Sequence, residues 1–537
     1  MIEKIRAIAE KFGLSLELPK PEFGDVAIPC FKAKQLGLKP EELARKIEGE
    51  LKKIGGIKKT EFVGGFLNIW LDENQKLLFV KNYGCKKKRE KVLIEHTSIN
   101  PNASPHIGRA RNAIIGDSLS RLLKFYGYDV ERHYYVNDIG KQVAMLALAA
   151  SGKENFDQML EVYKQAAERI EKDEEFAKKV SEFLEKIEQN DAAAIKKIKR
   201  IVKKCVAGQR AILKKIGVDF DFFDYESSFL QEAKRMVEQF YREKKLLKDK
   251  EGKLVFDLRG SGLEAGMKEP FVALTRPNGT TLYLTRDIAY TIWKLKRAKQ
   301  NIIVLGEDQK LYFKQLSYIL KGLGFEAPKI IHYSMVLVRA GGEIRKMSTR
   351  AGTYVLLEGF FNLIKDKLAE EARQRKSSIS EREIEKLASN VVRYTIAKID
   401  YDKNVIFDVE EATRLIGNTA IYLNYSLARA KSILKKLGKK NKTNANIKEL
   451  GHFESLLLHQ LFLFPFVLEN AVKRLDISLM AKYSYELCKI FNDFYENCPV
   501  VTAEKEEKEK RLALLLLFIK VLESCFSILG LHALERI

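Results

Sequence analysis

Two short motifs carry residue types that bind and activate phosphates. The first, Pro105-His106-Ile107-Gly108-Arg109, stands where a predicted strand is followed by a predicted helix. The start of a helix offers free N–H groups and a positive dipole end to an anion, and Gly108 lets a nucleotide lie close to the backbone. His106 can donate a hydrogen bond to a phosphate. Alone, the motif is weak evidence, because the composition predicts roughly 0.4 occurrences of His-x-Gly in the chain by chance. A helix-start histidine beside a turn glycine explains it equally well.

The second motif, Lys346-Met347-Ser348-Thr349-Arg350, follows a predicted strand and lies in a glycine-bounded loop. A mobile loop with Lys346 and Arg350 can close over a triphosphate and supply positive charge as pyrophosphate leaves. As an isolated feature it is better explained as a basic surface loop. The two motifs together, in this order and on these elements, are much harder to attribute to chance.

The elements around the first motif predict a doubly wound α/β domain. Lys91–Glu95 is a short apolar run typical of a buried parallel strand, a helix is expected over Pro105–Tyr126, and a second strand over Asp129–Val136. The charged helical segment from about Gln142 to Leu247 is predicted to be an insertion into this domain. Strand patterns return in four later segments, namely Lys253–Leu258, Thr281–Leu284, Asn301–Leu305 and Ile330–Val338.

Three domains are predicted in the 537 residues. Residues 1–85 form a small α+β unit with a helix over Glu41–Ile54 and a strand over Glu61–Trp70. Residues 86–409 form a Rossmann-like catalytic domain with the helical insertion at about 142–247. Near its end a helical stretch is expected over Arg373–Lys386. Residues 410–537 show only helical patterns, interrupted by a polar loop at Gly438–Asn446.

The composition favours a protein that binds a polyanion. The formal charge is +23, which suits nucleic acid first and a membrane surface second, although a Lys/Glu-rich surface typical of heat-adapted proteins is an alternative. The six cysteines lack the spacing of a zinc site or a disulfide framework. The most apolar stretches, Leu512–Ile519 and the region around Leu456–Leu468, are expected to be too short for a membrane span. A cytoplasmic protein without zinc is therefore expected.

The pair His106-Ile107-Gly108 and Lys346-Met347-Ser348 resembles the two signatures of class I aminoacyl-tRNA synthetases. The flanking residues resemble the arginyl-tRNA synthetase family over nearly the whole chain. The matching segments are Val92–Asn102, His133–Gly140, Tyr283–Tyr290, Gly306–Gln309, Tyr425–Arg429 and Phe491–Tyr495, together with Pro21–Asp25 and Gly65–Asn68 in the N-terminal unit.

The resemblance implies an arginine pocket formed by Glu95, Asn100, Tyr283, Asp287 and Gln309. The chemistry agrees, since a guanidinium is best held by carboxylates in planar, hydrogen-bonded geometry. Ordinary roles stay open, because Asp287 could cap a helix over Ile288–Lys296 and Glu95 could be a strand-end acid.

The resemblance also implies that ATP, with Mg²⁺, is the second substrate. His106 and Lys346 are the expected catalytic residues, helped by Arg109, Ser348 and Arg350. ATP is expected to contact His106, Gly108, Arg109, Gly306, Asp308, Lys346 and Met347. Three residues depart from the family pattern: Arg109 replaces a second histidine, Thr349 replaces a lysine, and Tyr312 stands where histidine is frequent.

The expected macromolecular partner is tRNA-Arg, bound by a monomer. Phe66 and Asn68 match residues that read a D-loop base, and Tyr425 and Tyr495 could stack on anticodon-loop bases or pack in the core. The family resemblance implies that tRNA must bind before arginine is activated. Because of Arg109, the main alternative is a catalytically impaired tRNA-binding paralogue. A zinc-bearing or editing relative is disfavoured by the cysteine spacing and the short insertion, and a simple nucleotidyltransferase by the C-terminal helices.

Overall fold

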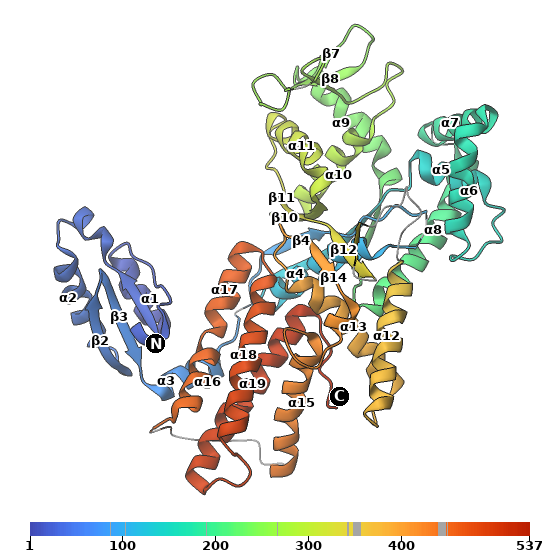
Figure 1. The fold of residues 1–537 in the computed structure, drawn as a ribbon. Coiled ribbons are helices and arrows are strands. Elements are labelled where there is room, and N and C mark those ends of the chain that lie inside the picture. Colours follow the sequence, from blue (N-terminus) through green and yellow to red (C-terminus); the bar gives the residue numbers. More distant parts are fainter. Residues whose placement is uncertain are drawn as a thin grey trace.

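A five-stranded parallel sheet forms the centre of the molecule (Figure 1). The computed structural model describes residues 1–85, 87–102, 104–189, 191–265, 267–340, 343–346, 356–438, 447 and 449–536. The strands of the sheet are β4 (Lys91–Glu95), β5 (Asp129–Val136), β6 (Phe222–Tyr225), β10 (Gln300–Gly306) and β11 (Lys329–Tyr333). Their order, β11-β10-β4-β5-β6, is that of a doubly wound fold in which the direction of winding reverses between β4 and β10. The predicted fold class is thus confirmed.

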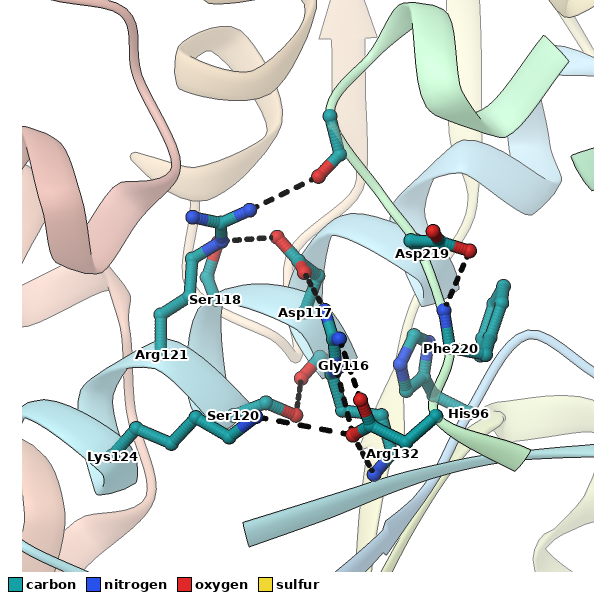
Figure 2. A network of polar contacts seen from close by, with 12 residues as sticks. His96, Gly116, Asp117, Ser118, Ser120, Arg121, Lys124, Arg132, Asp219 and Phe220 are labelled. Carbon is teal, nitrogen blue, oxygen red and sulfur yellow. Dashed lines mark hydrogen bonds and ion pairs between the residues drawn. The ribbon is translucent and has the colours of Figure 1, made fainter. Parts of the chain in front are cut away.

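Helix α4 (Ile107–Phe125) connects β4 to β5 and is covered by the sheet and by helices α13 and α19. Its polar side chains therefore need partners inside the protein. Asp117 accepts a hydrogen bond from Arg121 (Nε–Oδ2 2.7 Å; Figure 2) and another from Arg393 (Nη2–Oδ2 2.7 Å). Arg393 also donates to the carbonyls of Ile216 and Leu529, each at 2.8 Å. One buried guanidinium thus joins four segments that are distant in sequence.

Four helices lie between β5 and β6 and form the teal and green lobe of Figure 1. They are α5 (Lys141–Ala149), α6 (Met159–Lys172), α7 (Glu174–Glu188) and α8 (Ala192–Lys215). The segment predicted as an insertion also contains β6, which pairs in parallel with β5. The central sheet therefore resumes inside that segment, earlier than the helical pattern indicated. The sequence signal of β6 is weak because the strand is an edge strand of four residues.

A second lobe lies between β6 and β10. It consists of α9 (Leu230–Arg242), β7 (Leu247–Lys248), β8 (Leu254–Asp257), β9 (Phe271–Ala273) and α10 (Tyr283–Arg297), with α11 (Lys310–Gly322) after β10. The strand predicted over Thr281–Leu284 is wrong, because this segment makes one isolated bridge at Thr281 and then enters α10. The strand predicted over Lys253–Leu258 exists, but in a separate antiparallel sheet.

The single strand predicted over Ile330–Val338 is two strands in two sheets. The chain leaves the central sheet after β11 and starts β12 (Val336–Ala340), which pairs with β13 (Glu343–Lys346) and with β14 (Val405–Phe407). Ser334 makes the break, because its backbone N–H donates to the carbonyl of Tyr401 instead of continuing the ladder. Between β13 and β14 lie α12 (Leu357–Gln374) and α13 (Glu381–Ala397). The helical stretch predicted over Arg373–Lys386 is therefore interrupted.

The N-terminal unit is a small α+β domain joined to the rest by α3 (Figure 1). Its elements are α1 (Ile2–Lys11), β1 (Val26–Pro29), α2 (Pro40–Leu51), β2 (Ile57–Val63), β3 (Phe66–Leu71) and α3 (Glu73–Asn82). The strand predicted over Glu61–Trp70 is a hairpin of β2 and β3 instead. Its turn requires glycine, because Gly64 and Gly65 have φ of +59° and +87°.

The C-terminal part is helical, as predicted. It contains α14 (Val409–Ala412), α15 (Ala420–Leu437), α16 (His452–Phe462), α17 (Phe464–Arg474), α18 (Ser478–Asn497) and α19 (Lys505–Leu529). The polar loop predicted at Gly438–Asn446 lies, apart from Gly438, outside the described residues. The apolar stretches in this part were expected to be too short for a membrane span, and this expectation was wrong. By length and composition, His452–Arg474 and Lys505–Leu529 are both long and apolar enough to cross a membrane. In the fold 44% and 61% of their most apolar windows are buried inside the protein, as core helices also are.

Candidate active site

A pocket of about 240 Å³ lies at the carboxyl ends of β4 and β10, where the winding of the sheet reverses. Doubly wound sheets bind ligands at this position, because the loops that follow the two strands diverge there. All five residues predicted to hold arginine line the pocket, together with Arg109 and Gly306. The five are Glu95, Asn100, Tyr283, Asp287 and Gln309.

Asp287 is a buried carboxylate with one free oxygen. It lies inside α10, not before the helix as predicted, and so it caps no helix. Oδ2 accepts a hydrogen bond from the hydroxyl of Tyr312 at 2.5 Å, whereas Oδ1 has no hydrogen-bond partner among the described residues. Burial, with a smaller contribution from the charge of Glu95, raises the pKa of Asp287 to about 7 against the opposing effect of the hydrogen bond from Tyr312. A buried oxygen without a partner is a site for a donor that arrives with a ligand.

Glu95 has an internal partner that the sequence did not reveal. Its Oε2 accepts a hydrogen bond from the ammonium of Lys294, which is 1% exposed and lies on the face of α10 that carries Asp287. The strand-end position of Glu95 was predicted correctly, but Lys294 was not identified as part of the site. Residues seven apart on a helix share a face, and this spacing is the signal that could have identified it.

The loop after β4 shapes the wall of the pocket. Thr97 and Ser98 have φ of +80° and +37°, which is uncommon for residues with a side chain. Asn112 on α4 stabilises this conformation, because its side-chain oxygen accepts from the N–H of Thr97 at 2.6 Å and its amide donates to Val304 at 2.9 Å. Asn100 follows and donates to Gln142 at 2.8 Å. Backbone strain of this kind collects at ligand sites.

His106 is the N-cap residue of α4, where the helix-start interpretation placed it. Its Nδ1 is buried and has no hydrogen-bond partner. Burial and the charge of Arg109 lower the pKa of His106 to about 4, so the imidazole is neutral at pH 7. Gly108 makes room for the ring, because a Cβ atom at this position would lie 2.9 Å from two ring atoms. The helix start therefore presents a neutral donor beside free N–H groups.

The other predicted ATP contacts follow β10. Gly306 ends the strand and lines the pocket, and Asp308 is exposed with its carboxylate turned back toward Gly306. A Cβ atom at Gly306 would lie 2.4 Å from Asp308 Oδ1. Lys346 is the last residue of β13. Met347, Ser348, Thr349 and Arg350 lie outside the described residues.

The N-terminal pair Phe66 and Asn68 is on β3. Asn68 is buried, with 3% of its surface exposed. Phe66 is half-buried and meets Phe31 edge-on, with ring centroids 4.9 Å apart. Phe31 is 61% exposed and was not identified from the sequence. Gly65 allows this contact, since a Cβ atom there would lie 2.4 Å from the Phe31 ring.

Tyr425 and Tyr495 lie on α15 and α18 and are not core residues. Arg429 lies between them, with its guanidinium carbon 4.4 Å from the centre of one ring and 4.7 Å from the other. Asn492 accepts a hydrogen bond from Arg429 at 3.3 Å. The result is a part-exposed platform of two rings and one cation, which suits stacking on nucleic-acid bases.

Comparison with known proteins agrees with this geometry. Residues 73–410 match the catalytic domain of class I tRNA synthetases (R), residues 423–537 match the DALR anticodon-binding domain, and residues 1–71 match the N-terminal domain of arginyl-tRNA synthetases. The catalytic-domain match covers more than half of the chain, and with the doubly wound sheet it defines a class I tRNA synthetase.

The relatives narrow the class to one family. The arginine–tRNA ligase of Methanocella arvoryzae is 34% identical over 97% of this chain and 95% of its own length. That of Archaeoglobus fulgidus is 34% identical over 99% and 98%. The structure of Thermus thermophilus arginyl-tRNA synthetase superposes with a TM-score of 0.85 over 100% of this chain and 99% of its own, at 24% identity. The chain belongs to the arginyl-tRNA synthetase family.

Proposed function

We propose that this protein attaches arginine to tRNA-Arg in two steps. The arginine carboxylate attacks the α-phosphate of ATP, which forms arginyl-adenylate and releases pyrophosphate. The 2′-hydroxyl of the terminal tRNA adenosine then attacks the carbonyl carbon of the adenylate and releases AMP. Both leaving groups are good, so catalysis rests mainly on positioning and on stabilising charge.

The observation that carries the proposal is the free, buried oxygen of Asp287 in a pocket at the sheet's switch point. A guanidinium supplies the donors that this oxygen lacks, and Tyr312 holds the carboxylate in place. Glu95, Asn100, Tyr283 and Gln309 complete the predicted arginine contacts.

ATP is assigned to the open side of the pocket, between the start of α4 and the end of β10. His106 is the proposed donor to the phosphates, Arg109 adds positive charge, and Gly108 and Gly306 allow close approach. Asp308 is the proposed adenosine contact. Lys346, Met347, Ser348 and Arg350 are proposed to close over the phosphates from the loop after β13. Mg²⁺ is expected to enter as the complex with the phosphates of ATP.

Transfer RNA is assigned to three domains. Residues 1–85 are proposed to contact the tRNA corner through Phe66 and Asn68, residues 86–409 the acceptor end, and residues 410–537 the anticodon loop through Tyr425 and Tyr495. The charge of +23 supports this assignment, because phosphate contacts supply much of the affinity for nucleic acid. We expect a cytoplasmic monomer in which bound tRNA is needed for arginine activation.

The test is charging of total tRNA with each labelled amino acid, beside ATP–pyrophosphate exchange with and without tRNA. Charging with arginine alone, and exchange only when tRNA is present, is the expected result. Charging with another amino acid would overturn the arginine assignment. Binding of tRNA without charging would favour the non-catalytic paralogue and would make Arg109→His the next variant to measure.

A further inference from the structure

The pocket contains a cation of its own. Lys294 is buried with its ammonium on Glu95 Oε2, and both side chains line the cavity. The ammonium also lies 4.3 Å above the centre of the Tyr290 ring. Lys294 therefore has a carboxylate on one side and an aromatic face on another, both of which attract its ammonium group.

The ring beneath Lys294 is rigidly held. The Tyr290 hydroxyl donates to Asp224 at 2.7 Å, and His133 makes a 2.6 Å contact with the same carboxylate. Tyr135 stacks on the ring with centroids 4.3 Å apart and planes at 10°. Because these partners come from β5 and β6, the ring that faces the ammonium is held against the central sheet.

Among the residues that the structure describes, four charged ones line the pocket, and they divide into two sets. Arg109 stands at the start of α4 on the side assigned to ATP. The other three are Glu95, Asp287 and Lys294. Arg286, next to Asp287 in sequence, is already paired with Glu226 at 2.5 Å. When Asp287 is deprotonated, two carboxylates and one cation leave the arginine side of the pocket with a single unmatched negative charge.

We infer that Lys294 is a specificity-determining positioning residue: it neutralises and orients Glu95, so that the pocket matches a ligand of net charge +1. Arginine has this charge, with a guanidinium, an ammonium and a carboxylate. Decarboxylated arginine, agmatine, has the same guanidinium and chain but carries +2. Without Lys294 the pocket would hold two unmatched carboxylates and would favour the dication. This inference rests on the proposed function of the pocket.

The experiment compares agmatine with arginine in Lys294→Met. The measured quantity is the ratio of the agmatine inhibition constant to the arginine KM in tRNA charging. We expect this ratio to fall about tenfold or more, because a unit charge a few ångströms away is worth at least that factor at the effective dielectric of a protein site. Lys296→Met removes an exposed lysine from the same helix and should leave the ratio unchanged.

A double variant distinguishes two possible roles of Lys294: setting the net charge of the pocket, and supporting the side chain of Glu95. Glu95→Gln with Lys294→Met removes both charges and restores one net negative charge, so the ratio should return toward the wild-type value although arginine binds more weakly. If Lys294→Met does not fold because Glu95 is left unpaired, Lys294→Gln removes the charge and keeps a donor for Glu95.

If Lys294→Met and Lys294→Gln raise the arginine KM but leave the ratio of the agmatine inhibition constant to the arginine KM unchanged, the inference is overturned. Lys294 would then be a structural support of Glu95 only. Failure of the wild-type protein to charge arginine would instead overturn the proposed function, so the two failures are distinguishable.

Discussion

At the scale of single residues, the buried and unpaired oxygen of Asp287 lowers the stability of the unliganded protein. A buried carboxylate with one unmatched oxygen is destabilising, and the protein tolerates it because a ligand supplies the missing donors. Among the described residues, Tyr312 supplies the hydrogen bond to the other carboxylate oxygen of Asp287.

Asp287→Asn should reduce kcat/KM for arginine roughly 10- to 100-fold, the value of a lost charge-assisted hydrogen bond. The effect should lie in the arginine KM more than in the ATP KM, because the side chain faces the arginine side of the pocket. Steady-state charging assays measure both. Asp157→Asn, at an exposed turn before α6, is the control. An unchanged arginine KM would remove Asp287 from the pocket assignment.

The pH dependence follows from the raised pKa of Asp287, about 7. Guanidinium binding needs the carboxylate, which loses its proton as pH rises through 7, so kcat/KM for arginine should increase between pH 6 and pH 8. The hydrogen bond from Tyr312 lowers this pKa. Tyr312→Phe should therefore move the midpoint of the profile to higher pH. A profile that is flat in both proteins would contradict the assignment.

Sequence patterns were enough to bring Glu95 and Asp287 to one pocket and to place His106 at the start of α4, because each lies in a motif of the family. They could not identify Lys294. A lysine in the run Trp293-Lys294-Leu295-Lys296 looks like a solvent-exposed residue, and only the strand that carries Glu95, 199 residues away, makes it a buried one. Phe31 was missed because its contact with Phe66, on β3, leaves no signal in the local sequence.

At the scale of elements, helix α4 links the phosphate motif to the rest of the molecule. Its N-cap is His106 and its first turn contains Gly108. Its middle carries Asp117, which is paired with Arg121 (Figure 2) and also with Arg393. His96 lies against the same helix, because Gly116 leaves room for its ring. The position of the helix is therefore set by close contacts along its length.

Gly108→Ala should lower the rate of ATP–pyrophosphate exchange about tenfold or more without lowering the melting temperature. The new methyl group would displace the His106 ring, whereas alanine is about 1 kcal/mol better than glycine inside a helix. Gly359→Ala is a matched control, because Gly359 is also in the first turn of a helix and its Cβ would meet nothing. Equal exchange rates in both variants would show that the ring position does not matter.

Arg393→Ala should destabilise the fold by about 3–5 kcal/mol, because it breaks a buried ion pair with Asp117 and leaves the carbonyls of Ile216 and Leu529 without this donor. Denaturant unfolding with a tryptophan or circular-dichroism signal measures this change. Arg382→Ala, at an exposed position on the same helix, should change stability by less than about 0.5 kcal/mol. Similar losses in the two variants would contradict a central role for Arg393.

The elements that the sequence predicted best are those whose local pattern agrees with their environment. In β4, β5 and α4 the observed burial of the residues follows the pattern of apolar residues in the sequence. Thr281–Leu284 failed because its β-branched and aromatic residues favour a strand, while the packing of Leu284 and Ile288 makes the segment the start of α10. Ile330–Val338 failed because a hydrogen bond between Ser334 and Tyr401 divides one apolar run between two sheets.

At the scale of the whole molecule, the adenylation pocket and the aromatic platform of Tyr425, Arg429 and Tyr495 lie on different domains. Contacts between the platform and tRNA can therefore change the affinity for tRNA without changing the affinity for arginine or ATP. Base stacking contributes about 1–3 kcal/mol per base, and the cation between the rings adds charge attraction to the backbone.

Arg429→Ala should raise the KM for full-length tRNA-Arg about tenfold and leave the kinetics with an acceptor-stem minihelix unchanged, because the minihelix does not reach α15 and α18. Phe31→Ala, in the N-terminal domain, should also raise the full-length KM, and the two effects should add because the sites share no contacts. Charging assays with the two RNAs measure each variant and the double variant. An equal loss on both RNAs would mean that Arg429 acts on the catalytic domain through the fold and not through the anticodon loop.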